Sequence, residues 1–256
     1  MKTVVFPYKM ASAGSKLLAK ALGAKRVKAD GKFKPKMDML IINWGNSVAP
    51  KWAVNGLQVL NHWNNIFVSH NKLSSLTQLK KDGVTTPDFT TDIEQAKKWI
   101  KEKHIVMCRT ILCGHSGNGI VVAQKEEELV PAKLYTKYVK RKNEFRVVIF
   151  RGKIIDACEK RRKKEAPDKV NNFIRGTHNG YVFAYQNVVL PEIVKQEALR
   201  AMKSLQLDFG SVDVAYNEKQ NKAYVFECNT APGMSSENSP TLKTYSKVFQ
   251  EYTKGC

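Results

Sequence analysis

Two stretches near the C-terminal end decide the fold: 211-SVDVAY-216 and 224-YVFECNTAPG-233. Both begin as runs of apolar and β-branched or aromatic residues, and the polar stretch 217-NEKQN-221 lies between them. This pattern predicts a β-hairpin with its turn near residue 220. Such a turn places Asp213 opposite Glu227, where two like charges destabilise a sheet unless something neutralises them.

A divalent cation would remove this repulsion. Strand alternation predicts that Glu227 shares its face with Val225 and Asn229, whereas Cys228 points the other way. Two carboxylates and an amide oxygen are ligands suited to Mg²⁺, so the predicted metal ligands are Asp213, Glu227 and Asn229. The residues alone leave one alternative open, in which both acids form ion pairs with neighbouring Lys and Arg.

A glycine-rich stretch, 114-GHSGNG-119, separates the apolar runs 105–108 and 120–123. Glycines allow backbone N–H groups to approach phosphate oxygens closely, which favours a phosphate-covering loop. The stretch lacks the Lys and Ser/Thr of a P-loop, and a plain hairpin turn is the alternative. Arg109, just before the loop, and Lys72 could neutralise phosphates, or each could be a solvated surface charge.

The remaining pattern is that of an α/β protein. A strand-helix-strand opening over 3–8, 15–22 and 39–43 predicts a small α/β lobe, with a basic loop over 25–36 between the helix and the second strand. Trp44, Trp52 and Trp63 are expected in the core or at a lobe interface. The other expected elements are helices over 73–79, 92–102 and 194–205, strands over 105–108, 120–123 and 134–138, and a hairpin over 145–150 and 153–158.

Composition excludes several classes of protein. The 256 residues are 43% hydrophobic and 26% charged, typical of a globular chain, and no apolar run is long enough to cross a membrane. Five cysteines without paired CxxC spacing predict reduced thiols and a cytoplasmic location. The net charge of +20 is the outlier, with 11 basic and 2 acidic residues in 1–70. Such a field favours anionic partners such as nucleotides, nucleic acid or acidic peptides, and the alternative is a generally basic surface that keeps the protein soluble.

The order of these motifs resembles the ATP-grasp superfamily and, within it, the RimK-like carboxylate–amine ligases, over nearly the whole chain. The Asp213 strand and the stretch 226-FECNTAPG-233 carry the most specific resemblance. Weaker matches are 71-NKL-73 with the helix after it, 105-IVMCR-109 with the glycine loop, the hinge-like 134–139, Glu144 seven residues after Lys137, and 172-NFIRG-176.

The resemblance implies an α/β (α+β) ATP-grasp fold in which an N-terminal α/β lobe (1–70), a lid subdomain (71–135) and a C-terminal subdomain (136–256) hold the nucleotide. It implies ATP and one or two Mg²⁺ ions as cofactors. The implied catalytic residues are Arg109, Lys160, Arg175 and Asn172. The implied nucleotide-binding residues are Lys72, Arg109, Gly114, Ser116, Gly117, Gly119, Lys137, Tyr138, Val139 and Glu144.

Two positions depart from the family pattern. Arg109 replaces the lysine of the lid strand, which keeps the charge but changes a point donor into a fork. Lys137 replaces the hinge acid, so adenine would be recognised by the backbone without a side-chain acceptor. The segment 159-EKRRKKE-165 is also more basic than ATP binding requires, and its surplus charge is expected to attract an anionic acceptor together with the N-terminal lobe.

The activity implied is ligation through an acyl phosphate: ATP activates a carboxylate, and an amine then displaces phosphate to form an amide. Expected partners are a small molecule or peptide supplying the carboxylate and the amine, and an anionic polymer such as nucleic acid or an acidic peptide, with no membrane. Two alternatives stay open: a nucleic-acid-binding or nucleic-acid-modifying ATP-grasp protein, and an ATP-dependent kinase on the same fold. Neither the substrates nor the oligomeric state can be read from the sequence.

Overall fold

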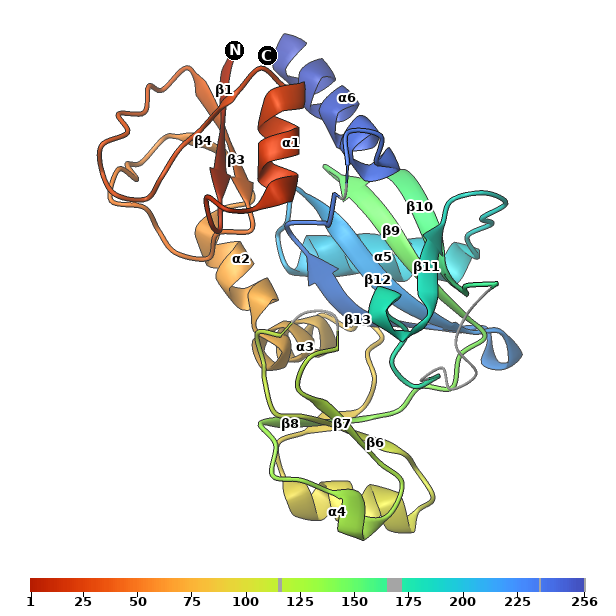
Figure 1. Cartoon of the computed structure of the whole chain (residues 1–256). Helices are drawn as coiled ribbons and strands as arrows, with labels where there is room; N and C mark the ends of the chain where they lie inside the picture. Colours follow the sequence, from red (N-terminus) through yellow and green to blue (C-terminus); the bar gives the residue numbers. More distant parts are fainter. Residues whose placement is uncertain (115–116, 165–171, 235, 256) are drawn as a thin grey trace.

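Three β-sheets organise the computed structural model, which describes residues 1–114, 117–164, 172–234 and 236–255 (Figure 1). The first sheet is parallel, as expected for a strand-helix-strand opening, and the chain then continues into two helices. Its strands, in spatial order, are β2 (Lys25–Arg26), β1 (Lys2–Pro7), β3 (Met39–Trp44) and β4 (Gln58–Leu60). The helices are α1 (Ala13–Ala21) and, after the sheet, α2 (Trp63–His70) and α3 (Lys72–Lys81).

The second sheet is antiparallel and lies at the far end of the molecule from the first (Figure 1). Helix α4 (Ile93–Lys101) covers it through buried Trp99 and Ile100. Its strands, in spatial order, are β5 (Phe89–Thr90), β8 (Leu134–Lys137), β6 (Val106–Arg109) and β7 (Ile120–Ala123), and the short helix η1 (Glu126–Glu128) follows β7.

The third sheet is the largest and is also antiparallel. In spatial order it contains β11 (Tyr181–Ala184), β10 (Lys153–Arg162), β9 (Asn143–Phe150), β12 (Phe209–Asn217) and β13 (Lys222–Asn229), with η2 (Thr177–Asn179) and η3 (Glu218–Gln220) in its connections. Because side chains alternate along a strand, its two faces form separate cores.

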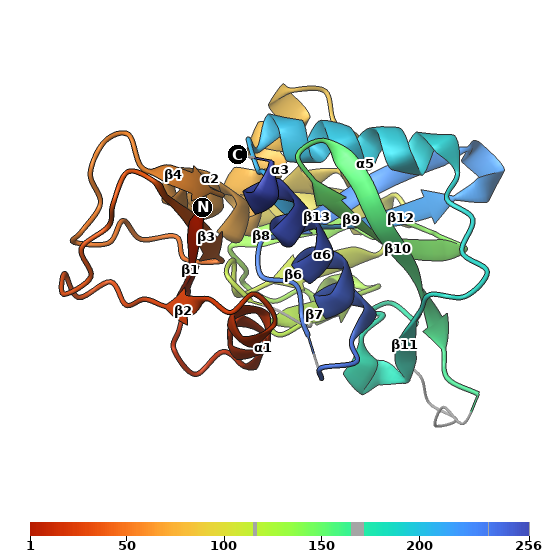
Figure 2. The same ribbon diagram turned by 90° about the horizontal axis from the view of Figure 1, so that it is seen from above.

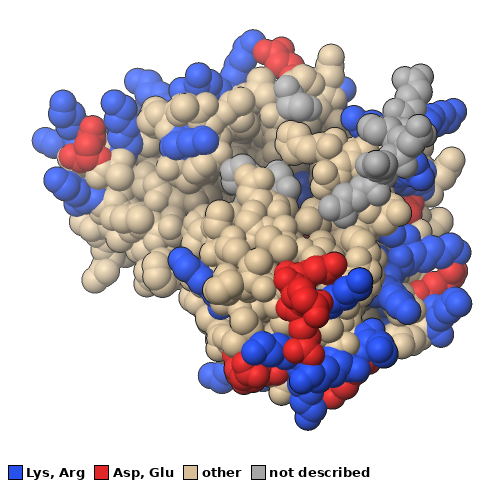
Figure 3. Space-filling model, turned by 60° about the horizontal axis from the view of Figure 1, so that its bottom comes forward, with Lys and Arg blue, Asp and Glu red and all other residues tan. Residues whose placement is uncertain are grey.

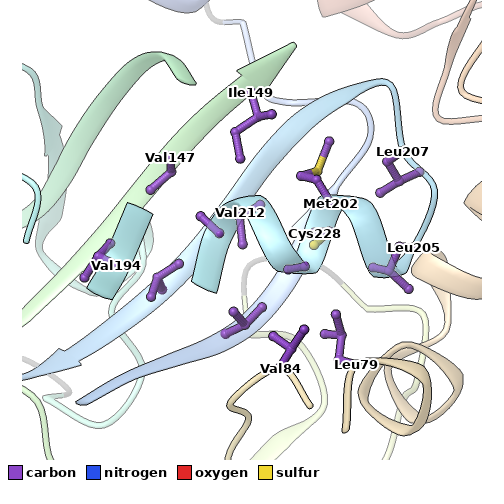
Figure 4. Packing of buried hydrophobic residues seen from close by; sticks show 14 of the residues in the cluster. Leu79, Val84, Val147, Ile149, Val194, Met202, Leu205, Leu207, Val212 and Cys228 are labelled. Atoms are coloured by element: carbon purple, nitrogen blue, oxygen red, sulfur yellow. The ribbon is translucent and has the colours of Figure 1, made fainter. Parts of the chain in front are cut away.

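Helix α5 (Glu192–Ser204) covers one face of this sheet, where Val194 and Met202 pack against Val147 and Val212 (Figure 4). Helix α6 (Pro240–Lys254) packs on the other face and beside α1 (Figure 2). The second core therefore joins the third sheet to the first.

Most expected elements are present within a few residues, but the strands β4, β5 and β11 were not among them. Helices α2 and α6 were not predicted, although Pro240 followed by buried Leu242, Tyr245 and Phe249 is a readable helix signal. The basic segment 25–36 begins with a two-residue strand, β2, because it can pair with β1. The expected tryptophans are buried in the core.

The division at residues 70 and 135 stays a prediction, and strand β8 spans the second of these positions. In the described part of the chain, no helix combines the length and apolar character that crossing a membrane requires.

Candidate functional site

The acidic hairpin forms as predicted, and Asp213 on β12 lies directly opposite Glu227 on β13. The register shifts between Asp213 and Val214, so that Val214 pairs with Val225 and leaves Phe226 as an extra residue. Such a bulge reverses the alternation beyond it. The prediction that Val225 shares the face of Glu227 is therefore wrong: Val225 is fully buried in the core on the α5 side.

Two cations from neighbouring strands hold Asp213. Arg146 on β9 is its cross-strand partner and donates Nε to Oδ1 at 2.7 Å and NH2 to Oδ2 at 3.0 Å. Lys160 on β10 donates Nζ to Oδ2 at 2.9 Å. Burial by itself would raise the pKa of this carboxyl, which is only 4% exposed, but the two cations outweigh burial and hold the pKa well below its usual value.

Glu227 is held by a cation from a distant part of the chain. Helix α3 begins at Lys72, after the Asn71 side chain caps its first turn, and Lys72 donates Nζ to Glu227 Oε2 at 2.5 Å. Burial opposes ionisation of Glu227, yet the nearby Lys72 lowers the pKa of the carboxyl overall. This ion pair ties the hairpin to the first turn of α3.

Arg109, at the end of β6, has a different environment. Its Nε is buried and has no hydrogen-bond partner within the described residues. Burial lowers the pKa of the guanidinium, and the charge of Glu227 partly restores it. A buried N–H that lacks an acceptor is rare in folded proteins, so this guanidinium fits an anionic ligand such as a phosphate.

Glu144 lies on the same face of β9 as Arg146, two residues earlier, and is buried. Lys160 donates to its Oε1 at 2.5 Å, and Arg141 Nε donates to its Oε2 at 2.7 Å. Lys160 thereby bridges Glu144 and Asp213. A ribose hydroxyl at Glu144, as the family pattern implies, would have to share the carboxylate with these two cations.

The hinge residues lie where β8 leaves the second sheet. The ammonium of Lys137 sits 3.2 Å from Asp88 Oδ2 and 5.2 Å from the centroid of the Trp99 ring. The backbone N–H groups of Lys137 and Tyr138 donate to Asp88 O and Ile105 O. Both the side chain and the backbone of Lys137 are therefore bound within the second sheet and its covering helix. Val139, two residues later, is buried.

The glycine loop lies next to Ile174, in the segment 172–176. Gly117 has φ of 80°, and a Cβ there would lie 2.6 Å from Ile174 Cγ2, so only glycine fits. Gly119, at φ of 73°, accepts from Thr110 N at 2.8 Å. Gly114 lies at the start of this loop, and the predicted phosphate ligand Ser116 lies outside the described residues.

Arg175 and Asn172, two of the implied catalytic residues, lie in surroundings that differ from each other. Arg175 donates NH1 and NH2 to the carbonyls of Lys142 and Arg141, which fastens the segment 172–176 to the end of the hinge. Asn172 is exposed and accepts from Tyr181 OH at 3.2 Å. Neither side chain contacts the carboxylate network through a hydrogen bond in this structure.

One network therefore unites Lys72, Glu144, Lys160, Asp213 and Glu227, all of which the sequence predicted. Arg109 lies close enough to Glu227 for the carboxylate to raise the pKa of its guanidinium. Two members were missed, Arg141 and Arg146. Arg146 could have been found, because strand alternation places it on the face of Glu144 two residues away.

The donor set fits a magnesium–polyphosphate ligand. Within residues 1–114, 117–164, 172–234 and 236–255, no three His, Cys, Asp or Glu gather as a metal cluster, so the third protein ligand would be the amide of Asn229, two residues from Glu227. Three carboxylates face five cations, which leaves a formal charge of +2. The cations are Lys72, Arg109, Arg141, Arg146 and Lys160.

Comparison with known proteins supports the fold. No protein-family model matches the chain. It is 26% identical over 235 residues to a probable alpha-L-glutamate ligase of Psychromonas ingrahamii, covering 85% of this chain and 74% of that one. The structure of the ATP-grasp ligase PsnB in complex with a precursor variant, Mg and ADP matches with a TM-score of 0.71 at 10% identity, covering 98% of both chains.

An ATP-grasp RimK domain protein of Sphaerobacter thermophilus matches with a TM-score of 0.60 at 13% identity, covering 95% of this chain and 94% of that one. These structures share the three-sheet architecture at low identity, and the sequence similarity to the glutamate ligase is distant. The chain therefore has the ATP-grasp fold, and its sequence is similar, at 26% identity, to a probable alpha-L-glutamate ligase.

Proposed function

We propose that the protein is an ATP- and Mg²⁺-dependent carboxylate–amine ligase that forms ADP, phosphate and an amide. The observation that carries the proposal is the convergence of the opposed pair Asp213 and Glu227 with five cations, one of which, Arg109, has a buried N–H without an acceptor among the described residues. A magnesium–nucleotide supplies both the cation that the acids need and the anion that the basic groups need.

In the proposed reaction a substrate carboxylate oxygen attacks the γ-phosphorus of ATP, the bond to the β-phosphate oxygen breaks, and ADP leaves. The amine then attacks the acyl carbon, phosphate departs with the bonding electrons, and the amine loses a proton. Asp213, Glu227 and Asn229 would hold Mg²⁺, which would draw charge from the phosphates of the nucleotide. Lys72, Arg109 and Lys160 are placed to neutralise charge that develops on the transferring phosphoryl group.

L-Glutamate is the first substrate to test as the amine component, because the curated relative is named a probable alpha-L-glutamate ligase. An anionic acceptor also fits the exposed cations at the end of β10, Arg162, Lys163 and Lys164. Arg161 is not part of this set. It forms an ion pair with Glu159 at 2.7 Å and donates to two carbonyls.

The decisive assay measures ADP release with glutamate, other amino acids, acidic peptides or nucleic acid, together with the mass of the product. A product whose mass equals that of the two substrates less one water supports the ligase, whereas a product heavier than one substrate by a phosphoryl group indicates a kinase. Glu227→Gln is expected to slow turnover by about 10³-fold because a metal ligand is lost. The matched control, Glu192→Gln, changes an exposed acid on α5 and should leave the rate unchanged.

Long-range attraction of the acceptor is tested by salt. The KM for the acceptor should rise from 0.01 M to 0.15 M salt, as the Debye length falls from about 30 Å to about 8 Å. Changing Arg162, Lys163 and Lys164 together to Gln should flatten this dependence and leave ATP affinity unchanged. A KM for the acceptor that does not change with salt would show that these residues do not contribute to acceptor binding.

A further inference from the structure

The N-terminal lobe carries a second charged surface, which ligation does not explain. Of the 11 basic residues in 1–70, only Lys20 forms an ion pair with a carboxylate in the described part of the chain, with Glu237. Elsewhere, in 71–256, acids neutralise many of the cations, including Lys97, Lys101 and Arg200. Figure 3 shows the basic side chains gathered on this lobe with few acidic ones among them.

The charge is concentrated on one segment, which we name the lysine segment, residues 27–36. Its exposure alternates: Lys32, Lys34 and Lys36 are exposed, and Phe33 and Pro35 between them are partly buried. Alternation with period two is that of an extended chain, in which every second residue is separated by roughly 6.6 Å. The side chains of Lys32, Lys34 and Lys36 therefore lie in a row on the exposed side of the segment.

The segment is anchored, so this row has a fixed base. Phe33 packs edge-on against Trp52 with 5.0 Å between ring centroids, and Trp52 packs in the same way against Phe6 at 5.1 Å. Trp52 Nε1 donates to Lys28 O at 2.6 Å, and Lys51 N donates to Ala29 O at 3.2 Å. The inward side chains thus offset the entropy cost of ordering a segment whose outward side chains are cationic.

This surface faces away from the ATP site. The core beneath it contains Val4, Phe6 and Ile41, whereas Val5 and Ile42, on the opposite face of the first sheet, pack toward α1 and α6. The nucleotide network has its own cations, so the row is not required for ATP binding. Unneutralised like charges held together weaken a fold, and an anionic partner bound to them would offset this cost.

We propose that the lysine segment, with Lys51 beside it, binds the phosphate backbone of a nucleic-acid strand without sequence preference. Lys51 Cβ lies close to Gly31, so its exposed ammonium extends the same surface. A nucleic-acid strand presents one charge per nucleotide at regular spacing, which suits a linear row of point charges. Ammonium groups position a backbone and carry no sequence information by themselves. Asp30 is the acid within the segment and accepts a hydrogen bond from Lys32 N at 3.3 Å, so the four lysines and one aspartate of 27–36 leave a formal charge of +3.

The test is fluorescence anisotropy with labelled single-stranded RNA and DNA homopolymers, without ATP. Four phosphate contacts predict a slope of log affinity against log salt of about −3, or roughly 50-fold weaker binding at 200 mM than at 50 mM salt. The variant with Lys28, Lys32, Lys34 and Lys36 changed to Gln should lose most of the affinity and most of this slope. Its matched control changes four exposed lysines that lack ion pairs to described acids: Lys98, Lys103, Lys203 and Lys219.

The control has the same net charge as the test variant, so equal losses in both would show general charge attraction and overturn the proposal. Tighter binding of poly-glutamate than of either homopolymer, at equal length and salt, would assign the surface to acidic polypeptides instead and also overturn it. Because the assay contains no ATP and no ligase substrate, its result is independent of the proposed reaction. Turnover of the test variant, measured separately with a small acceptor, should match the wild type.

Discussion

Free divalent metal should bind poorly to this protein until a nucleotide is present. Both oxygens of Asp213 accept hydrogen bonds from Arg146 or Lys160, and Glu227 Oε2 accepts one from Lys72. A cation arriving alone must displace these groups, whereas polyphosphate offers them other oxygens. The informative perturbation is Lys72→Met, which removes the cation on Glu227 and leaves the pair on Asp213 in place.

The magnitude follows from the charges of the network. Its formal charge of +2 repels an ion of charge +2, and at about 8 Å in a water-like dielectric this costs about 2 kcal/mol, or roughly 30-fold in affinity. Lys72→Met halves the charge and therefore the repulsion, to about 1 kcal/mol, so metal should bind roughly fivefold more tightly than to the wild type. Bound ADP changes the net charge of the site from positive to negative and should strengthen metal binding in both proteins.

Mn²⁺ serves as the probe, because the free ion gives an electron paramagnetic resonance signal that is lost on binding. Dissociation constants are measured at low salt for the protein alone, and ADP affinity is measured with and without Mn²⁺ by calorimetry. Thermodynamic linkage requires the same coupling factor in both directions. Lys98→Met, at an exposed position on α4, is the control and should behave as the wild type.

The reasoning is refuted if the wild type binds Mn²⁺ without nucleotide as tightly as Lys72→Met does, because the ion pair would then offer no competition. It is also refuted if ADP affinity is the same with and without Mn²⁺. Neither result depends on ligase turnover.

Three further predictions concern stability and the glycine loop. Arg146→Met leaves the buried Asp213 with Lys160 alone and should lower the free energy of unfolding by about 3 kcal/mol in urea titrations, and a loss under about 1 kcal/mol would contradict the ion-pair network. The pKa of Asp213 is lowered in the folded state, so its contribution to the free energy of unfolding is present above the unfolded pKa of about 3.9 and is lost as pH falls below that value. Asp213→Asn should therefore flatten the acid side of the curve of stability against pH. An unchanged curve would show that Asp213 does not cause the loss of stability in acid. ATP should slow hydrogen exchange of the amides at 117–119, and equal exchange with and without ATP would remove the loop from the phosphate site.

The sequence by itself determined the acidic hairpin, because two alternating strands with a polar turn between them are a local pattern. It also predicted that Asp213 lies opposite Glu227, but the structure reaches this pair through the bulge. The turn places Asn217 opposite Lys222, and this register alone would put Asp213 opposite Phe226. The parallel pairing of β1 with β3 was predicted from the strand-helix-strand order, and helix α3 from leucines at helical spacing.

Only the tertiary structure decided which charges meet. Arg146 and Lys160 reach Asp213 because β9 lies between β10 and β12, an order that joins strands more than 50 residues apart, and Lys72 reaches Glu227 across 155 residues. The bulge that turns Val225 into the core has no local signal, because the residue it leaves unpaired, Phe226, fits the strand pattern as well as its neighbours do. Local pattern predicts which face a side chain takes while the strand is regular, whereas bulges, sheet order and packing, which depend on the whole chain, decide where that alternation reverses and what lies opposite each residue.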